Sequence, residues 1–369
     1  MDHELSDVDN ETNVVKKVES KRIVEKVLSW YDRHQRDLPW RKTRNPYHIW
    51  VSEIMLQQTQ VETVIPYYHR FLCQFPTVVA LAEAPLDHVL KAWENMGYYC
   101  RARNLHAAAR TVVEHFEGRI PKTQQGLMRL PGIGPYTAAA ILSIAFQKPL
   151  PAVDANVNRI LTRLLAIEEP EWRQRAKYVS DTAKALIPKK GAGHFNQALM
   201  DIGATVCTAQ KPRCEVCPIR TACEAYRQGL QEKLPLRKKR RPIPHHQVTA
   251  GVIRDRAGRI LITQRSNSGL LGGLWKLPGG RQRLGESVKT CLRREVQEEV
   301  GIRVRVGKAV ASIKHAYTHF RITLHAFHCT HRDGSPTALG CRDWRWTSVS
   351  GFDDLAFSKA DRKIIQVLQ

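Results

Sequence analysis

The spacing of hydrophobic residues changes once along the chain, near residues 230–246, and this change limits the folds available to it. Before it, apolar residues recur at helical spacing, as in Ala84–Met96 and Ile160–Ile167. After it, Val248–Ile253 and Arg259–Thr263 are short β-like runs, and longer helical and strand-like segments follow. The pattern predicts an all-α domain followed by an α+β domain.

The length and a basic segment place the boundaries. A chain of 369 residues exceeds what one compact core usually holds, so two domains are expected. The segment Glu232–His246 contains three prolines and the basic run Lys238–Arg241, which favours an extended linker. We therefore predict a disordered acidic tail over residues 1–20, an all-α domain over 21–228, a basic linker over 229–246 and an α+β domain over 247–369.

The net charge indicates a polyanionic partner. Lys and Arg total 58 against 35 Asp and Glu, a formal charge of +23, and such an excess favours binding to nucleic-acid phosphates. The alternative is a basic surface kept for solubility. The acidic N-terminus has no apolar signal-peptide core, and no run approaches the roughly 18 apolar residues of a membrane span. We expect a monomeric cytoplasmic protein without membrane contact, associated with the nucleoid if bacterial.

Four of the nine cysteines form a cluster in the sequence. An odd number of cysteines without an export signal argues against a disulfide framework. Six, two and five residues separate the clustered cysteines, Cys207, Cys214, Cys217 and Cys223. Four thiolates at such spacing can hold a structural zinc or an iron–sulfur cluster, and ligand type alone does not choose between them. Unligated core cysteines are the remaining alternative.

The segment Leu130–Thr137 has the composition of a helical hairpin. Gly132 and Gly134 permit a tight turn, and Pro135 suits the first turn of a helix that continues to Phe146. Free N–H groups at that helix start, together with its dipole, suit a DNA phosphate. An ordinary turn between two helices could use the same residues.

Two carboxylates are candidates for catalysis. Asp154 follows the hairpin by about twenty residues, where it could also be the N-cap of the helix Ala155–Leu165. Glu53 begins the run Glu53–Val61, where it could also be a first-turn glutamate favoured by the helix dipole. Two carboxylates in different environments can divide the tasks of proton donor and electrostatic stabiliser in one reaction.

The C-terminal region contains a pattern of glycines and acidic residues between Gly280 and Ile302 that forms a complete Nudix box. Its residues Glu295, Glu298 and Glu299 fall at i, i+3 and i+4, on one side of a helix. A cation such as Mg²⁺ or Mn²⁺ would relieve their repulsion and bind a diphosphate. The alternative is a solvated acidic face paired with Arg293 and Arg294.

These motifs together resemble the MutY family of helix–hairpin–helix–GPD glycosylases over nearly the whole chain. The resemblance implies an all-α glycosylase domain with an iron–sulfur loop, joined to an α+β Nudix-like domain. It implies a base-excision repair enzyme that hydrolyses the N-glycosidic bond of adenine mispaired with 8-oxoguanine or guanine in double-stranded DNA. It also implies that the four clustered cysteines hold a 4Fe–4S cluster.

The resemblance assigns the catalytic roles. Glu53 would protonate N7 of adenine, so burial should raise its pKa. Asp154 would stay ionised and stabilise the sugar cation, directly or through a covalent intermediate, while Tyr136 and Asn156 orient Asp154 and the sugar. Bifunctional relatives such as endonuclease III carry a lysine at the Tyr136 position and form a Schiff base. A tyrosine cannot, so a monofunctional glycosylase that leaves an abasic site is expected.

The resemblance also assigns binding residues. Gln58 and Tyr98 would fill or wedge the DNA helix, and Gly132 and Gly134 would contact its backbone. The residues matching the adenine pocket are Arg36, Trp40, Arg41, Leu56 and Gln197, although core packing is an alternative for Trp40 and Leu56.

In the C-terminal domain this sequence departs from the family. Typical members have a degraded Nudix box and use the domain only to read the oxidised guanine, whereas here the box is whole. The domain either hydrolyses nucleotides such as 8-oxo-dGTP with Mg²⁺ or Mn²⁺, or retains the Nudix-box residues without hydrolysing nucleotides. The sequence leaves both alternatives open. The segment Tyr317, Thr318, His319 resembles the family's Phe-Ser-His loop that reads 8-oxoguanine, with two mild changes.

Three other functions are compatible with parts of the sequence. A thymine or uracil mismatch glycosylase would share the cysteine cluster, Tyr136 and Asp154, but Glu53 and the C-terminal domain argue against it. A Nudix pyrophosphatase whose helical domain only binds DNA would keep its main activity in the variant Asp154→Asn. A non-catalytic DNA-binding protein would require both carboxylates to be incidental.

Overall fold

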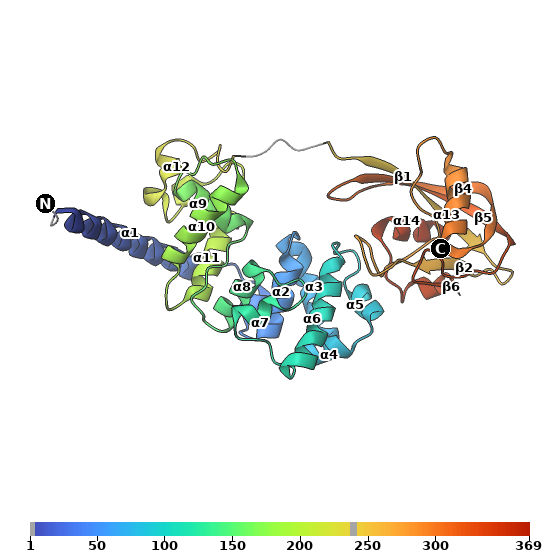
Figure 1. The fold of residues 1–369 in the computed structure, drawn as a ribbon, viewed down its shortest axis with the longest axis horizontal. Helices are drawn as coiled ribbons and strands as arrows, with labels where there is room; N and C mark the ends of the chain where they lie inside the picture. Colours follow the sequence, from blue (N-terminus) through green and yellow to red (C-terminus); the bar gives the residue numbers. More distant parts are fainter. Residues whose placement is uncertain (1–3, 237–241) are drawn as a thin grey trace. The chain divides into compact units, whose positions relative to one another are not determined.

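The computed structural model describes residues 4–236 and 242–369, which divide into two compact units (Figure 1). The first unit comprises Met1–Tyr68 and Thr111–Lys239, and the second comprises His69–Arg110 and Arg240–Gln369. The basic run Lys238–Arg241 of the predicted linker lies outside the described residues. No helix in the described ranges is long and apolar enough to cross a membrane.

The regular elements among the described residues of the first unit are all helices, as the sequence predicts. Its elements are α1 (Glu4–His34), η1 (Pro39–Arg41), α2 (Pro46–Leu56), the start of α3 (Val61–Gln74), the end of α6 (Cys100–Phe116), α7 (Gln124–Met128), α8 (Pro135–Ala145), α9 (Ala155–Leu164), α10 (Trp172–Leu186), α11 (Ala192–Thr205), η2 (Cys214–Val216), η3 (Arg220–Ala222) and α12 (Glu224–Arg227). Its main core packs α1, α9 and α11 together through Val27, Tyr31, Ile160, Leu161, Phe195 and Ile202.

The structure has a helix over most of residues 1–20, the range for which the sequence predicts a disordered tail, and the tail stays a prediction. Helix α1 begins at Glu4 and runs without interruption into the core helix, ending at His34. The segment contains no Pro or Gly before residue 20, so nothing in it interrupts a helix that the core stabilises further along.

The second unit contains a six-stranded mixed sheet. Its strands are β1 (His245–Arg254), β2 (Ile260–Gln264), β3 (Trp275–Lys276), β4 (Arg303–Ala316), β5 (Arg321–Asp333) and β6 (Asp343–Thr347). The order is β3-β2-β1-β5-β4, β6 pairs with β2, and β1 runs parallel to β5 from His245 opposite Arg321 to Arg254 opposite Thr330. The other helices of this unit are α4 (Val78–Glu83), α5 (Leu86–Ala92), α13 (Val288–Val300), η4 (Ser350–Phe352) and α14 (Lys359–Leu368).

The sheet is covered by one helix on each face, which confirms the predicted α+β class. Alternate residues of β2 point to opposite faces: Ile260 and Ile262 pack with Ile364 of α14, and Leu261 packs with Leu292 of α13. Helix α13, which carries the Nudix box, begins with the side chain of Ser287 as its N-cap.

The segment His69–Arg110 belongs to the second unit because polar contacts tie it to the C-terminal domain. Arg362 Nε lies 2.7 Å from Glu94 Oε1, and both side chains are largely buried. Gln264 Nε2 donates to Asp87 Oδ1 at 2.8 Å. A helical periodicity cannot show such pairings, since the partners are more than 170 residues apart in the chain.

Candidate active site

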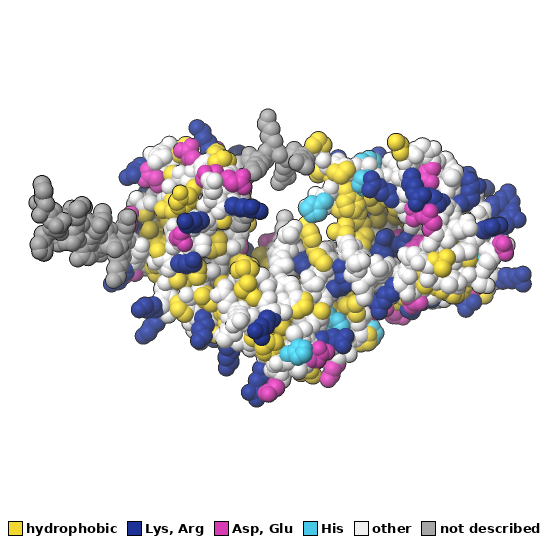
Figure 2. Space-filling view, viewed as in Figure 1, with side chains coloured by type: hydrophobic (Ala, Val, Ile, Leu, Met, Phe, Trp, Pro, Cys, Tyr) yellow, Lys and Arg dark blue, Asp and Glu magenta, His cyan; other side chains and the backbone are white. Residues whose placement is uncertain are grey.

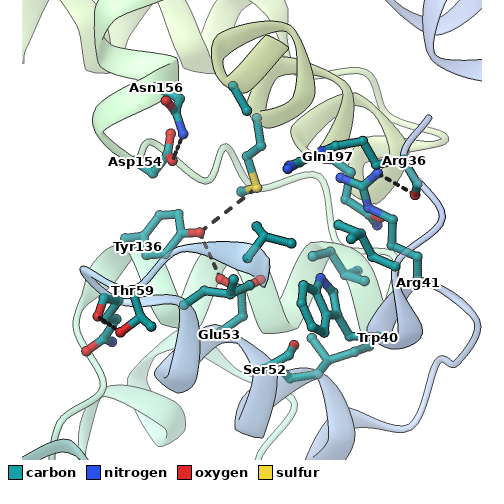
Figure 3. A pocket seen from close by; sticks show the side chains of 18 of the residues that line it. Arg36, Trp40, Arg41, Ser52, Glu53, Thr59, Tyr136, Asp154, Asn156 and Gln197 are labelled. Atoms are coloured by element: carbon teal, nitrogen blue, oxygen red, sulfur yellow. Dashed lines mark hydrogen bonds between the residues drawn. The ribbon is translucent and has the colours of Figure 1, made fainter. Parts of the chain in front are cut away.

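A cavity of about 400 Å³ opens in the first unit between α2, α8, α9 and α11 (Figure 3). Its volume is in the range of small-molecule pockets. The sequence-predicted residues that line it are Arg36, Trp40, Arg41, Glu53, Leu56, Gln58, Tyr136, Asp154, Asn156 and Gln197. The structure thus gathers in one cavity all the catalytic and adenine-pocket candidates, which span more than 160 residues of sequence.

Glu53 lies on α2 and faces the cavity. The helix begins at Pro46, preceded by the N-cap Asn45, so Glu53 lies in its second half and is not a first-turn glutamate. Its side chain is 5% exposed. Burial is the largest influence on its pKa, which is raised to about 7 although a hydrogen bond from Tyr136 opposes the shift. The pKa elevation expected from the sequence is therefore confirmed, and the carboxyl group can hold a proton near neutral pH.

Tyr136 is paired with Glu53. Pro135 starts α8, which places Tyr136 in the first turn, and its hydroxyl donates to Glu53 Oε2 at 2.8 Å (Figure 3). Burial raises the pKa of the phenol well above its ordinary value, so it remains a donor. The expectation that Tyr136 orients Asp154 differs from this contact, because the direction of α8 aims the phenol at α2.

Asp154 has both features weighed from the sequence: it caps a helix and it lines the cavity. Oδ1 accepts from the backbone N–H of Val157 at 2.7 Å, which makes Asp154 the N-cap of α9. Oδ2 accepts from Asn156 Nδ2 at 2.9 Å, as the expected orienting role of Asn156 requires. Burial raises the pKa of Asp154, while these donors act in the opposite direction.

Asn156 is held in turn by Arg159. Arg159 Nη2 donates to Asn156 Oδ1 at 2.9 Å, and the same guanidinium donates to the carbonyls of Gly203 and Cys207. Gly203 of α11 packs directly on Asn156, since a Cβ on Gly203 would lie 2.5 Å from Asn156 Cβ. This chain of contacts links the cap of α9 to the start of the cysteine loop.

Asp201 is a site residue that the sequence reasoning missed. It is fully buried on α11, and its carboxylate binds Arg36 Nε at 2.6 Å and Arg41 Nη2 at 2.7 Å. The two arginines assigned to the adenine pocket are thus fixed by one anion. An acidic residue inside the otherwise apolar run Ala198–Ile202 was the available signal, because a buried charge needs a partner.

Two further pocket candidates, Trp40 and Gln197, pack against neighbouring side chains and also line the cavity. Trp40 is buried, and its ring meets that of Tyr68 edge-on at 5.5 Å. Gln197 Oε1 accepts from the Tyr31 hydroxyl at 2.9 Å, and the residue also lines the cavity. For Trp40 the packing and pocket interpretations are therefore compatible.

The predicted DNA-contacting turns have unusual backbone conformations. Gln58 lies beside the cavity with a φ of 57°, a left-handed conformation that non-glycine residues adopt at a cost and that often marks functional sites. Gly132 has a φ of 78° and makes the turn of the hairpin. Gly134 is the N-cap of α8 without a side-chain cap, so the first N–H groups of that helix are available to an anion.

The four clustered cysteines line one small pocket beside α9 with Arg163. Arg163 Nη1 lies 3.3 Å from Cys207 Sγ, and its carbonyl accepts from Cys223 Sγ at 3.5 Å. Within residues 4–236 and 242–369, no three His, Cys, Asp or Glu side chains are grouped as ligands of a single metal ion.

Two family models match the chain. The model for the HhH-GPD superfamily base excision DNA repair protein matches residues 51–172, which include Glu53, Tyr136 and Asp154. The NUDIX domain model matches residues 249–367.

Relatives that align with most of the chain identify a narrower family than the two domain models do. Adenine DNA glycosylase of Rattus norvegicus is 34% identical over 398 residues, which cover 93% of this chain and 77% of the rat protein. The chain belongs to the adenine DNA glycosylase family. Adenine DNA glycosylase of Homo sapiens is also 34% identical and is covered over 73% of its length. Membership identifies the chain as a DNA glycosylase of base-excision repair, with the predicted two-domain fold class.

A solved structure resembles the helical part of this adenine DNA glycosylase family member. The structure of a thermostable thymine-DNA glycosylase superimposes with a TM-score of 0.53 and 32% sequence identity. It covers 57% of this chain and 97% of its own. The helical scaffold is thus shared with a glycosylase that is named for thymine, whereas the relatives above are named for adenine.

In this adenine DNA glycosylase family member, the predicted lesion-reading residues lie beside the predicted wedge residue Tyr98. Tyr98, Tyr317, Thr318 and His319 line one cavity of about 210 Å³ in the second unit. The hydroxyl oxygens of Tyr98 and Thr318 are 2.6 Å apart, a short hydrogen bond. Tyr98 has a φ of 49°, so like Gln58 it is a non-glycine residue assigned to DNA whose backbone is left-handed.

The three glutamates of the Nudix box line one open pocket of about 550 Å³ together with Lys276, and all three side chains are paired with protein cations. Glu295 and Glu298 both bind Arg294, at 2.8 and 2.9 Å. Glu299 is buried and pairs instead with Lys276 of β3 at 2.8 Å. Of the arginines proposed as partners for a solvated acidic face, Arg294 has that role, whereas Arg293 donates to a threonine.

Proposed function

We propose that the cavity of the first unit excises adenine from its mispair with 8-oxoguanine or guanine in duplex DNA. The observation that carries this proposal is the pair of carboxyl groups lining that cavity. Glu53 has a pKa of about 7 and can hold a proton, while Asp154 accepts two hydrogen bonds that favour its anion. Such a pair suits an acid and an electrostatic partner acting on one glycosidic bond.

The reaction requires the adenine to leave the base stack and enter the cavity. Glu53 then gives its proton to N7 of the base as the bond to C1′ lengthens, and the Tyr136 hydroxyl holds the carboxyl group in position. Asp154, oriented by Asn156, stabilises the positive charge that develops on the sugar. Arg36, Trp40, Arg41, Leu56 and Gln197 enclose the base.

We propose that the enzyme is monofunctional. At the start of α8 the residue facing Glu53 is Tyr136, and a phenol cannot form an imine with the sugar. Borohydride should therefore trap no covalent protein–DNA complex during the reaction. The abasic product should break only after alkali.

The cysteine loop is proposed to hold a 4Fe–4S cluster through Cys207, Cys214, Cys217 and Cys223. Four thiols around one pocket can hold such a cluster, and membership of the glycosylase family supports it over a single zinc ion. When bound, the cluster supplies four iron–thiolate links that fix the loop. Arg159, which joins the loop to Asn156, would pass that rigidity to the catalytic cap.

DNA contacts are proposed on both units. Gln58 and Tyr98 would enter the helix, and the hairpin glycines Gly132 and Gly134 would meet a phosphate. Lys and Arg side chains are numerous on the drawn face of each unit (Figure 2), in keeping with the net charge of +23. Tyr317, Thr318 and His319 would read 8-oxoguanine. We further propose that the enzyme acts as a monomer on chromosomal DNA.

A panel of duplexes tests this function. Adenine release is expected from A opposite 8-oxoguanine and opposite guanine, and none from thymine or uracil opposite guanine. A second candidate, a thymine or uracil mismatch glycosylase, is supported by the likeness to the thymine-DNA glycosylase structure. Release of thymine or uracil without release of adenine would favour that candidate and contradict the proposal.

The pH dependence should reveal Glu53 as an acid. Because the reaction needs the protonated carboxyl and its pKa is about 7, the single-turnover rate should be level below that pH and fall above it. The hydrogen bond from Tyr136 lowers the pKa of Glu53, so Tyr136→Phe should move the falling limb to higher pH. Rates measured from about pH 5.5 to about pH 9 test both statements. A rate that stays level across this range would contradict the acid role.

Gly203→Ala tests the support of the catalytic cap. The added Cβ would lie 2.5 Å from Asn156 Cβ and 3.2 Å from its Cα, so the start of α9 must shift. We expect a loss of single-turnover rate of about a hundredfold, since small displacements of catalytic groups are costly. Gly251→Ala is the control, because its Cβ would meet neighbours only at 3.5 Å. Equal rates in the two variants would show that the packing of Gly203 on Asn156 has no catalytic role.

A further inference from the structure

The buried glutamate of the Nudix box already has a complete set of partners. Glu299 is 8% exposed, and its Oε1 accepts from Thr263 Oγ1 at 3.0 Å. Its Oε2 accepts from the backbone N–H of Gly279 at 3.1 Å and lies 2.8 Å from Lys276 Nζ. Both carboxylate oxygens are therefore hydrogen-bonded within the protein, and one of them faces a full positive charge.

The sheet register positions the lysine. Lys276 lies on β3 directly opposite Thr263 of β2, and both side chains reach Glu299. Lys276 is only 7% exposed, and its ammonium also donates to the carbonyl of Gly279. A buried ammonium requires an anion and further acceptors, and this position provides both.

The outer glutamates of the box are occupied as well. The guanidinium of Arg294 lies 2.6 Å from Glu286, 2.8 Å from Glu295 and 2.9 Å from Glu298. Glu295 packs so closely on Gly280 that a Cβ there would lie 2.0 Å from its Oε2. A single cation thus gathers three carboxylates on the solvent side of α13.

This arrangement does not fit a divalent metal ion. Mg²⁺ and Mn²⁺ require several carboxylate or carbonyl oxygens directed at one point. Here the carbonyl of Gly279 and the Oε2 of Glu299 are directed at an ammonium, and an ion placed on them would meet its charge. The two protein cations Lys276 and Arg294 offset part of the charge of the four glutamates and so reduce the repulsion that would otherwise favour a metal.

We propose that Lys276 is the built-in cation of this Nudix box and replaces the divalent metal ion. The complete set of box residues then preserves the fold of the domain, and the domain does not hydrolyse nucleoside triphosphates. Lys276 becomes the residue that distinguishes a metal-free reading domain from a hydrolase. The inference is independent of the adenine cavity, so either can fail without the other.

Titration with Mn²⁺ tests the proposal in the whole 369-residue chain with its cluster loaded. Free Mn²⁺ is followed by electron paramagnetic resonance for the wild type, Lys276→Met, and Lys276→Met combined with Glu299→Gln. The dissociation constant for Mn²⁺ should be about 1 mM or higher in the wild type. In Lys276→Met it should be at least about tenfold lower. The double variant should return to weak binding. The control is Lys289→Met, which removes an exposed lysine from helix α13, the helix that carries Glu299. Its Mn²⁺ binding should match that of the wild type.

Two results would overturn the proposal. One is micromolar Mn²⁺ binding by the wild type, accompanied by Mg²⁺-dependent hydrolysis of 8-oxo-dGTP that is lost in Glu299→Gln. The other is a folded Lys276→Met protein that binds Mn²⁺ no more tightly than the wild type. If Lys276→Met does not melt cooperatively, the titration of the wild type decides the question alone. Lys276→Arg, which keeps the positive charge, should then fold and bind Mn²⁺ weakly. Adenine release by the wild type, measured in parallel, reports separately on the proposed function.

Discussion

Replacing Glu53 with glutamine is expected to reduce adenine release by at least about a thousandfold while leaving the protein folded. The amide has the shape of the carboxyl group and can still accept from the Tyr136 hydroxyl, but it has no acidic proton for N7 of the base. The measurement is the single-turnover rate on a duplex with one adenine opposite 8-oxoguanine. Glu83→Gln, an exposed change of the same kind, should leave the rate unchanged. A Glu53→Gln rate within tenfold of the wild type would remove Glu53 from the chemistry.

The same variant should have a pH-dependent gain in stability. Burial raises the pKa of Glu53 from its ordinary value to about 7, so the folded wild type loses stability as pH rises toward and through 7. Glutamine does not ionise and avoids this loss. The melting temperature of Glu53→Gln minus that of the wild type should therefore be larger at about pH 8 than at about pH 5. An equal difference at both values would show that Glu53 ionises normally.

Asp154→Asn is the second variant with a large expected effect, again about a thousandfold or more in the single-turnover rate. Asparagine can accept the hydrogen bond from the Val157 N–H and cap α9, so the fold should be retained. It cannot supply the negative charge that stabilises the developing sugar cation. Loss of rate with unchanged melting temperature would separate charge from structure.

Asp154→Ala is the matched control for the cap. Alanine loses both the charge and the N-cap, so it should lose the same activity and about 1 kcal/mol of stability in addition. The free energy of unfolding from denaturant titration gives the comparison. If Asp154→Asn kept the wild-type rate while Asp154→Ala lost it, capping alone would explain the residue, and the proposed electrostatic role would be wrong.

Much of the candidate site could be predicted from the sequence because its residues occur in contiguous motifs. The run that begins at Glu53 and the hairpin followed by Asp154 each identify a local element, and the fold brings them to one cavity. What the sequence could not show is which of these side chains pair. Tyr136 turned out to hold Glu53, because the direction of a helix axis is set by packing of the whole unit.

Residues that act through distant partners were missed for a physical reason. Asp201 binds Arg36 and Arg41, about 160 residues earlier, and only the packing of α11 beside η1 makes this pairing visible. In the sequence Lys276 is indistinguishable from other strand lysines. Its ion pair with Glu299 follows from the register of β3 against β2. Periodicity predicts which face is buried, whereas these pairings are properties of the tertiary structure.

The measurement that tests the central claim most directly is a single-turnover assay with the cluster-loaded wild type on a duplex containing one adenine opposite 8-oxoguanine. The products are divided and analysed with and without alkali, and free adenine is quantified. We predict stoichiometric release of adenine, with strand breakage only in the alkali-treated half. No adenine release from a folded, cluster-loaded preparation would contradict the assignment of the first-unit cavity as an adenine-excising site.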